Sequence, residues 1–198
     1  LPFAEWYSYL PKNTPVIVEP KIDGCAMALR YVDGILVKAW TRKGVDKTYC
    51  MRMIEDLPKY ILAKGTVEIR GELYGKGLIP ARSQRLAAGH LRKKQPSGMG
   101  LSFCAFQIFN GKGTEITNLR QLAKWGFLVT GYIKVTTNVV SEVKKLHQKW
   151  QDSLIFSLYP TDGIVVKVLN KDLQEEIGRT SIAPSWATAI KDTWKKTW

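Results

Sequence analysis

Cysteine and histidine are scarce in this chain of 198 residues, which has three cysteines and two histidines. Cys25, Cys50 and Cys104 are scattered and form no Cys-x-x-Cys pair, so neither a zinc site nor a disulfide framework is indicated. His90 and His147 are isolated from each other and from the cysteines. These absences argue against a metal centre built from thiolates or imidazoles.

Long apolar stretches are missing as well. No uninterrupted run approaches the roughly 20 residues that a membrane-spanning helix needs, and the first residues lack the charged-then-apolar plan of a signal peptide. Hydrophobic residues nevertheless make up 45% of the chain, which is too many for a disordered protein. We therefore expect a folded cytoplasmic protein with no membrane partner.

Acidic residues are few relative to basic ones, with 17 Asp and Glu against 30 Lys and Arg and a net charge of +13. Such an excess usually indicates a polyanionic partner, most often the phosphate backbone of nucleic acid. The segment 81–94 contains no acid, although its charge alone also fits a solvated helix face. Its candidate phosphate contacts are Arg82, Arg85, Arg92, Lys93 and Lys94.

Strand patterns dominate the chain, and a few helical patterns separate them. Asp33-Gly34 is a dipeptide that two-residue type I′ turns favour, so 25–32 and 35–40 are expected to form a β-hairpin. Further strands are expected at 67–74, 101–109 and 164–169, and helices at 48–57, 81–92, 117–125 and 140–150. The pattern predicts an α+β fold in which antiparallel β-sheets are flanked by helices, as one domain or a domain with a small subdomain.

The most informative short pattern is Lys21-Ile22-Asp23-Gly24, which lies between two short apolar runs. Glu19 and Asp23 place a carboxylate on either side of the lysine. A lysine acts as a nucleophile only as the neutral amine, and an apolar setting with other cations nearby favours that form. Because Lys-x-Asp-Gly also occurs by chance as a surface lysine beside a turn, its companions in the sequence decide its meaning.

Several further motifs follow Lys21 in order along the chain. They are Thr41-Arg42, Glu68-Ile69-Arg70-Gly71-Glu72, Ala87-Ala88-Gly89-His90-Leu91-Arg92, Asp162-Gly163-Ile164-Val165-Val166-Lys167 and Ala183-Pro184-Ser185-Trp186-Ala187-Thr188-Ala189-Ile190-Lys191. In order and residue type they resemble the adenylation (nucleotidyltransferase) domain of bacterial NAD-dependent DNA ligases, from about residue 15 to residue 191. The resemblance implies an ATP-grasp-like ligase catalytic core and a single adenylation domain over residues 1–198.

The resemblance also implies a reaction. Lys21 would be the nucleophile that takes AMP from NAD and forms a lysyl–AMP intermediate for sealing nicks in duplex DNA. Asp23 belongs to the same motif and is a further catalytic candidate. Lys167 and Lys191 would supply positive charge to the phosphate on which negative charge develops.

The remaining nucleotide contacts rest on the same resemblance. Glu19 would meet the exocyclic amine of adenine, Phe106 would stack on the base, and Val165 would close its other side. Glu72 would accept a hydrogen bond from a ribose hydroxyl, and Arg42 would reach ribose or phosphate. The alternatives are strand core for Phe106 and Val165, and surface charge for the ionised residues.

Some positions depart from the family pattern. Phe106 stands where the family usually has a stacking tyrosine, and Gln84 stands where it has an arginine, with Arg82 and Arg85 on either side. The compressed interval 72–82 resembles the shorter "B" type of bacterial NAD-dependent ligase, whereas 177–184 resembles the main type. A divergent or accessory ligase fits both observations.

Metal, missing domains and alternatives complete the expectations. Mg²⁺ is expected because phosphoryl chemistry needs charge neutralisation, and Asp162 is the one carboxylate nominated as a ligand. Since only positions 1–20 precede Lys21 and 192–198 follow Lys191, we expect a fragment without the family's N-terminal nicotinamide-mononucleotide-binding domain and C-terminal OB-fold, which another chain could carry. The alternative functions are an ATP-dependent polynucleotide ligase or capping-type nucleotidyltransferase, and a non-catalytic nucleic-acid-binding domain.

Overall fold

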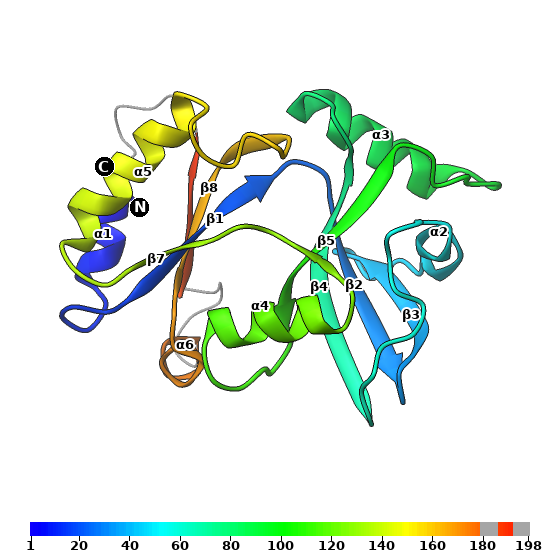
Figure 1. Cartoon of the computed structure of the whole chain (residues 1–198), viewed down its shortest axis with the longest axis horizontal. Helices are drawn as coiled ribbons and strands as arrows, with labels where there is room; N and C mark the ends of the chain where they lie inside the picture. Colours follow the sequence, from blue (N-terminus) through cyan, green and yellow to red (C-terminus); the bar gives the residue numbers. More distant parts are fainter. Residues whose placement is uncertain (179–185, 192–198) are drawn as a thin grey trace. The chain divides into compact units, whose positions relative to one another are not determined.

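The computed structural model describes residues 1–178 and 186–191. The chain divides into two compact units. Unit 1 consists of Leu1–Lys21, Lys112–Ile116 and Gly131–Trp198, and unit 2 consists of Ile22–Gly111 and Thr117–Thr130. The elements of both units are labelled in Figure 1.

Unit 1 is built on a four-stranded sheet with the strand order β7-β1-β8-β9. The pairs β1–β7 and β8–β9 are antiparallel, and β8 lies beside β1. The elements of this unit are α1 (Phe3–Ser8), β1 (Val16–Ile22), β7 (Ile133–Val135), α5 (Val139–Gln151), β8 (Thr161–Val168), α6 (Lys171–Gly178) and β9 (Ala187–Lys191).

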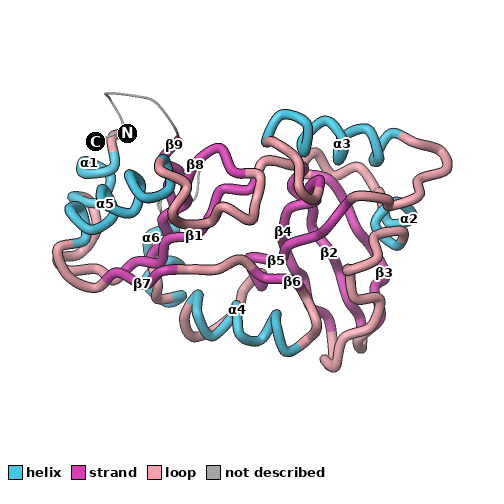
Figure 2. Tube along the Cα trace, turned by 45° about the horizontal axis from the view of Figure 1, so that its top comes forward, coloured by secondary structure: helices cyan, strands magenta, loops and turns pink. Residues whose placement is uncertain are grey.

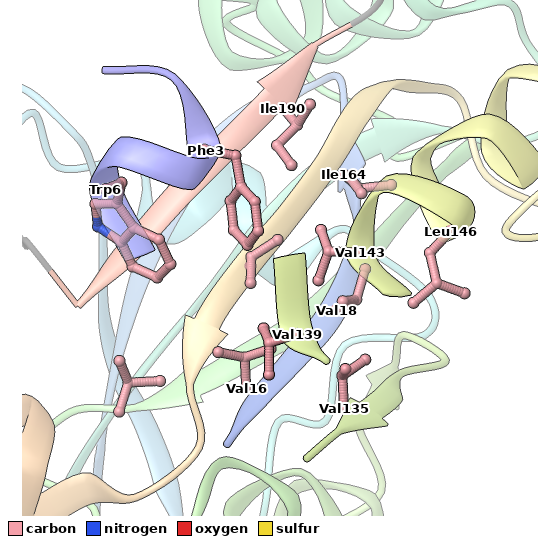
Figure 3. Packing of buried hydrophobic residues seen from close by; sticks show 12 residues of the cluster. Phe3, Trp6, Val16, Val18, Val135, Val139, Val143, Leu146, Ile164 and Ile190 are labelled. Atoms are coloured by element: carbon pink, nitrogen blue, oxygen red, sulfur yellow. The ribbon is translucent and has the colours of Figure 1, made fainter. Parts of the chain in front are cut away.

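Helices α1 and α5 cover one face of this sheet and enclose the core of unit 1, shown in Figure 3. Val18 of β1 and Ile164 of β8 point into this core, together with Phe3 of α1 and Val143 of α5. Because successive side chains of a strand point to opposite faces, the residues next to Val18 and Ile164 belong to the other face.

Unit 2 is built on a five-stranded sheet with the order β3-β2-β4-β5-β6, which Figure 2 shows in a second view. The pairs among β2, β3, β4 and β5 are antiparallel, whereas the short β6 joins β5 in parallel. The elements are β2 (Cys25–Val32), β3 (Ile35–Thr41), α2 (Thr48–Arg52), β4 (Thr66–Gly75), α3 (Pro80–Arg92), β5 (Leu101–Ile108), β6 (Leu128–Val129) and α4 (Glu115–Lys124), whose first residues belong to unit 1.

The expected β-hairpin is present. Val32 pairs with Ile35, and the two residues between them have positive φ angles, 46° at Asp33 and 85° at Gly34. Positive φ at both central residues is the requirement of a type I′ turn. The α+β fold class is likewise confirmed, with β6 as a parallel addition.

The largest difference from the expected element bounds is in the helix expected over 48–57, which ends at Arg52. Beyond it the N–H of Ile54 bonds the carbonyl of Met51, a tighter turn than an α-helix makes. Leu57 precedes Pro58, and a residue before proline is disfavoured in the helical region. The apolar spacing of this segment therefore reflects buried turns.

No helix within residues 1–178 and 186–191 is both long enough and apolar enough to cross a membrane.

Candidate active site

The face of the unit 1 sheet that points away from its core carries four of the expected nucleotide contacts. Val18 of β1 points into the core. Because side chains alternate along a strand, its neighbour Glu19 lies on the face away from that core. Lys21 is two residues beyond Glu19 and therefore shares its face. On β8, Val165 and Lys167 alternate with the core residues and also lie on this face.

Strand β9 adds a third lysine, Lys191, to the same face. Lys191 pairs with Gly163, and Ala189 pairs with Val165. Residues directly opposite one another in a ladder share a face, while Ile190 between them packs into the core. The register thus places Lys191 with the β1 and β8 residues, although more than a hundred positions of sequence separate Lys191 from β1.

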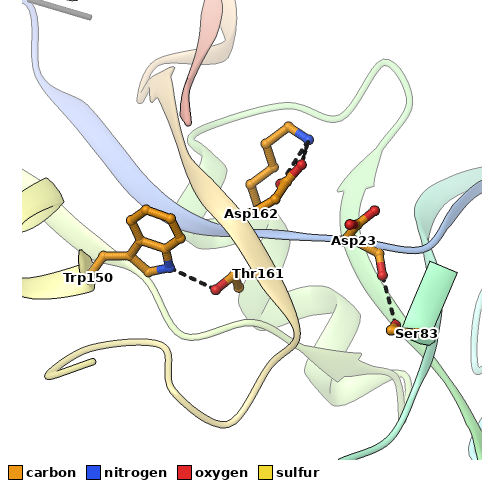
Figure 4. A network of polar contacts seen from close by, with 6 residues as sticks. Asp23, Ser83, Trp150, Thr161 and Asp162 are labelled. Carbon is orange, nitrogen blue, oxygen red and sulfur yellow. Dashed lines mark hydrogen bonds and ion pairs between the residues drawn. The ribbon is translucent and has the colours of Figure 1, made fainter. Parts of the chain in front are cut away.

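Lys21 makes an ion pair with Asp162 at the start of β8. Its Nζ lies 3.1 Å from Oδ1 and 3.3 Å from Oδ2 of Asp162. Their side chains are 29% and 30% exposed, so the pair is partly open to solvent. Figure 4 draws these two contacts. The carboxylate nominated from sequence as a metal ligand therefore orients the candidate nucleophile.

Glu19 and Lys167 form a buried ion pair. Nζ of Lys167 lies 2.7 Å from Oε2 of Glu19, and their side chains are only 8% and 3% exposed. Burial lowers the pKa of Lys167, but the carboxylates of Glu19 and Glu115 outweigh it and raise the pKa above its ordinary value. The other oxygen of Glu19, Oε1, is buried without a hydrogen-bond partner. It is an acceptor available to a ligand.

Two motif glycines sit where strands approach closely. A Cβ on Gly24 would lie 2.0 Å from the carbonyl oxygen of Leu73, and one on Gly163 would lie 2.4 Å from that of Ile190. Both distances are far below van der Waals contact, so only glycine fits. The glycines after Asp23 and Asp162 thus hold these motifs against neighbouring strands.

Within unit 2, the loop that follows Lys21 is tied to the start of α3. The Ser83 hydroxyl donates to the carbonyl of Asp23 at 2.8 Å and accepts the N–H of Gly75 at 2.9 Å. The contact between Ser83 and Asp23 is drawn in Figure 4. Ser83 therefore fixes Asp23 relative to β4, which carries Glu72 three residues before Gly75.

The other unit 2 candidates lie on or beside the sheet. Glu72 pairs with Ala26 of β2 and with Cys104 of β5, and it is half-buried. Phe106 is also half-buried and lies two residues after Cys104, where the register of β4 and β5 shifts. Arg42 follows β3 in an exposed turn.

The basic cluster, defined as Arg82, Arg85, Arg92, Lys93 and Lys94, is exposed throughout. Spacings of three and seven residues put its arginines on one side of α3, away from the buried Ala87. Burial raises the pKa of the Cys25 thiol, and the charges of Glu72 and Asp23 raise it further. The Arg92 charge acts in the opposite direction and lowers this pKa. Arg92 and Glu72 therefore both lie near enough to Cys25 to affect its thiol.

Unit 1 contains a second buried ion pair, between Lys171 and Glu115, that the sequence analysis did not predict. Nζ of Lys171 lies 2.9 Å from Oε1 of Glu115, and both side chains are buried. Each residue stands near the start of an amphipathic helix, where a charged residue normally faces solvent. The only signal in the sequence is that an acid and a lysine of opposite charge stand at the first positions of two helices. Of the last expected motif, residues 183–185 lie outside the described residues.

The fold of the chain is that of ligase nucleotidyltransferase cores. The ATP-dependent DNA ligase of bacteriophage T7, solved in complex with ATP, matches it with a TM-score of 0.54 at 15% identity. The match covers 86% of this chain and 62% of that structure.

The family follows from sequence. The family model described as NAD-dependent DNA ligase adenylation domain matches residues 4–82 and 77–194. The chain therefore belongs to the NAD-dependent DNA ligase adenylation domain family, and the resemblance drawn from the motifs is confirmed. The assignment to the "B" type stays a prediction.

Two relatives show how much of a longer protein is matched. The DNA ligase of Cellvibrio japonicus is 32% identical over 211 residues, which cover 91% of this chain and 31% of that protein. The DNA ligase of Natranaerobius thermophilus is 31% identical over 218 residues, which cover 94% of this chain and 33% of that protein. The chain thus spans about a third of the length of these relatives.

Proposed function

We propose that this chain carries out the self-adenylylation step of an NAD-dependent DNA ligase. The observation that supports this most directly is the sheet face that brings Lys21 together with Glu19, Lys167 and Lys191. A cluster of one partly open lysine, two further lysines and a buried carboxylate fits the handling of a nucleotide phosphate better than a structural role.

The step begins with Lys21 as the neutral amine. Its Nζ attacks the α-phosphorus of the AMP half of NAD, an N–P bond forms, and the bond to the bridging pyrophosphate oxygen breaks. Nicotinamide mononucleotide leaves with the electron pair of that bond. Asp162, with Oδ1 at 3.1 Å from Nζ, lies within reach to accept the proton of the amine.

The neighbouring charges have separate tasks in this proposal. Lys167 and Lys191 stabilise the negative charge that develops on the phosphate oxygens. The free Oε1 of Glu19 accepts a hydrogen bond from the adenine amine, which satisfies an otherwise orphaned buried oxygen. Val165 lies on the same face and packs against the base.

Unit 2 contributes groups that the resemblance assigns to the nucleotide. Glu72 accepts a hydrogen bond from a ribose hydroxyl, Phe106 stacks on the base, and Arg42 reaches ribose or phosphate. Asp23, fixed by Ser83, holds the loop after the nucleophile in place.

Mg²⁺ would supply charge neutralisation at the phosphates. The described residues contain no group of three or more Asp, Glu, His or Cys side chains that could hold a metal ion by themselves. Mg²⁺ in nucleotide enzymes commonly uses one or two carboxylates together with substrate phosphates, and Asp162 fits that mode as the single protein ligand.

Nicked duplex DNA is the proposed final acceptor of AMP, with the basic cluster on α3 as its contact surface. In that reaction the complete ligase, including domains beyond this chain or on a second chain, would move AMP to a 5′-phosphate and seal the nick. A cytoplasmic location, where DNA and NAD meet, follows from this function.

The donor is tested by incubating the chain with NAD or ATP labelled in the AMP moiety, followed by denaturing electrophoresis. We expect covalent label from NAD, and removal of that label when nicotinamide mononucleotide is added. Label from ATP alone would instead support the ATP-dependent alternative. No label from either donor, and no reversal with nicotinamide mononucleotide, would contradict the proposed step.

A further inference from the structure

A second buried ion pair lies in unit 1 beside the Glu19–Lys167 pair. Oε1 of Glu115, at the start of α4, accepts from Lys171 Nζ at 2.9 Å and from Gln174 Nε2 at 2.7 Å. Gln174 also donates to the carbonyl of Val168 at 2.7 Å, which anchors it to the end of β8. All three side chains are buried. The group is therefore held on the strand that carries Lys167.

The backbone fixes this group further. The N–H of Glu115 donates to the carbonyl of Leu169 at 2.9 Å, and the N–H of Lys171 donates to that of Gly113 at 3.0 Å. Thr114 and Asn170 form an isolated antiparallel bridge between the same two segments. Glu115 thus has little freedom to move relative to β8.

Stability alone does not explain two buried ion pairs. Removing two charges from water is costly, and replacing a buried pair by apolar side chains is often neutral or stabilising. Each pair here also leaves one carboxylate oxygen, Oε1 of Glu19 and Oε2 of Glu115, buried without a hydrogen-bond partner. Such an arrangement suggests that the charges serve a purpose other than packing.

The two pairs act on each other electrostatically. The Glu115 carboxylate raises the pKa of Lys167, second in strength to Glu19 among the groups that favour the ammonium. Lys171 in turn lowers the pKa of Glu19, which burial and Glu115 raise. The four groups are two acids and two lysines, so their formal charges cancel.

We propose that Glu115, held by Lys171 and Gln174 at the end of β8, is a positioning residue that keeps the Lys167 ammonium paired with Oε2 of Glu19. Oε1 of Glu19 is then left for the nucleotide, and the Lys167 ammonium remains available to the phosphate. The catalytic consequence rests on the proposed adenylylation, whereas the charge state of Lys167 does not depend on it.

The test compares a doubly neutral variant with a matched surface pair. The variant is Glu115→Gln with Lys171→Met, which leaves no unpaired charge at the site. The control is Glu142→Gln with Lys145→Met, which removes an exposed pair of the same 2.9 Å distance on α5 of the same unit. Unfolding curves establish that each protein is folded before the comparison.

The first readout does not require activity. NMR of lysines labelled with ¹⁵N at Nζ follows the deprotonation of Lys167, whose signal is assigned by its loss in a Glu19→Gln, Lys167→Met variant. We expect the Lys167 midpoint to fall in the Glu115→Gln, Lys171→Met variant and to stay in place in the control. An unchanged midpoint in the folded variant would overturn the proposal.

The second readout is the rate of adenylylation across pH. In the Glu115→Gln, Lys171→Met variant, we expect the alkaline decline of the rate to move to lower pH by the same amount as the Lys167 midpoint. In Lys171→Met alone, we expect this decline to move to higher pH or to stay in place. A purely structural role would change both variants alike, through folding. If the wild-type chain shows no adenylylation, the proposed function fails while the NMR readout still decides the role of Glu115.

A further variant serves if the doubly neutral protein does not fold. Gln174→Met removes the donor that holds Glu115 but keeps both charges. We expect a smaller shift of the Lys167 midpoint in the same direction, and a folded Gln174→Met protein with the wild-type midpoint would contradict the proposal.

Discussion

The charges on the sheet face of unit 1 and those of the basic cluster in unit 2 differ in what surrounds them. Lys21 and Lys167 each lie within 3.1 Å of a carboxylate oxygen, and Lys167 is almost completely buried. The basic cluster is fully exposed, and within residues 1–178 and 186–191 none of its members makes an ion pair with a carboxylate.

This difference separates two ways in which a protein uses positive charge. A buried cation with a fixed partner acts on one atom at short range, resists screening by salt, and is costly to leave unpaired. An exposed cluster acts through the summed charge of its side chains, and its affinity for a polyanion falls steeply as the salt concentration rises.

The largest effect is expected at the nucleophile. Lys21→Ala should abolish covalent attachment of AMP, because it removes the amine that lies beside Asp162. The fold should survive, since the Lys21–Asp162 pair is partly exposed and such pairs contribute little to stability. Labelling with NAD checks this, with Lys12→Ala, at an exposed lysine of the same unit, as the control. Persistent label in Lys21→Ala would move the nucleophile elsewhere.

Lys191→Ala comes next. Loss of one electrostatic stabiliser should slow adenylylation by about 10²-fold. Lys149→Ala, at an exposed lysine on α5, should leave the rate unchanged. Single-turnover rates of the two variants decide the matter, and equal rates would return Lys191 to a surface role.

Lys167→Ala should show the cost of an unpaired buried charge. It leaves Glu19 without its partner, and we expect a loss of about 3–5 kcal/mol in the free energy of unfolding at neutral pH. Because the pKa of Lys167 is raised, the stabilisation is fully present below its ordinary value of 10.5 and is lost only as the pH rises through the raised value.

The exposed pair provides the contrast. Lys145→Ala, which removes the partner of Glu142, should cost about 0–1 kcal/mol. Denaturant titrations at several pH values measure both variants. Similar losses for Lys167→Ala and Lys145→Ala would contradict the distinction drawn between buried and exposed charges.

The basic cluster should respond to salt instead. Replacing Arg92, Lys93 and Lys94 together by alanine should reduce the slope of log K against log salt for nicked duplex by about two to three units, at about 0.9 per phosphate contact. Binding measured over a salt series tests this. Because Arg92 and the ribose candidate Glu72 both act on the Cys25 thiol, the adenylylation rate of the triple variant is measured as well. A normal slope with a lost rate would place Arg92 at the nucleotide.

The smallest effect is expected at Gly89. It lies in the helical interior of α3, and a Cβ there would meet no atom within 4 Å. Gly89→Ala should therefore stabilise the protein by about 0.5–1 kcal/mol. Gly89 lies on the same side of α3 as Arg85 and Arg92. If a phosphate backbone approaches this side closely, the added methyl group should weaken its binding. An unchanged or lower free energy of unfolding for Gly89→Ala would contradict the expected gain from helix propensity.

The sequence predicted the hairpin well because its turn chemistry is local. Asp33-Gly34 specifies a two-residue turn, and β2 begins and ends where the pattern indicates. The helices α1 and α6 and the strand β9 were not expected, since α1 is only six residues long and β9 consists mainly of small residues. Their stability comes from packing against the unit 1 sheet, which a local pattern does not contain.

The candidate site divides in the same way. The resemblance nominated Glu19, Lys21, Lys167 and Lys191, but their common face follows from strand alternation on β1 and β8 and from the register of β8 and β9. The pairing of Lys21 with Asp162 spans 141 positions, and no spacing rule connects them. Glu115 resembles an ordinary acid in the first turn of a helix, so only the structure shows that it is buried.

The most direct test of the central proposal is the intact mass of the chain, followed by peptide mapping. After incubation with NAD we expect a single added AMP, located on the peptide that contains Lys21, and its removal by nicotinamide mononucleotide. An adduct on another peptide, or a mass unchanged by either treatment, would contradict the assignment of Lys21 as the adenylylated residue.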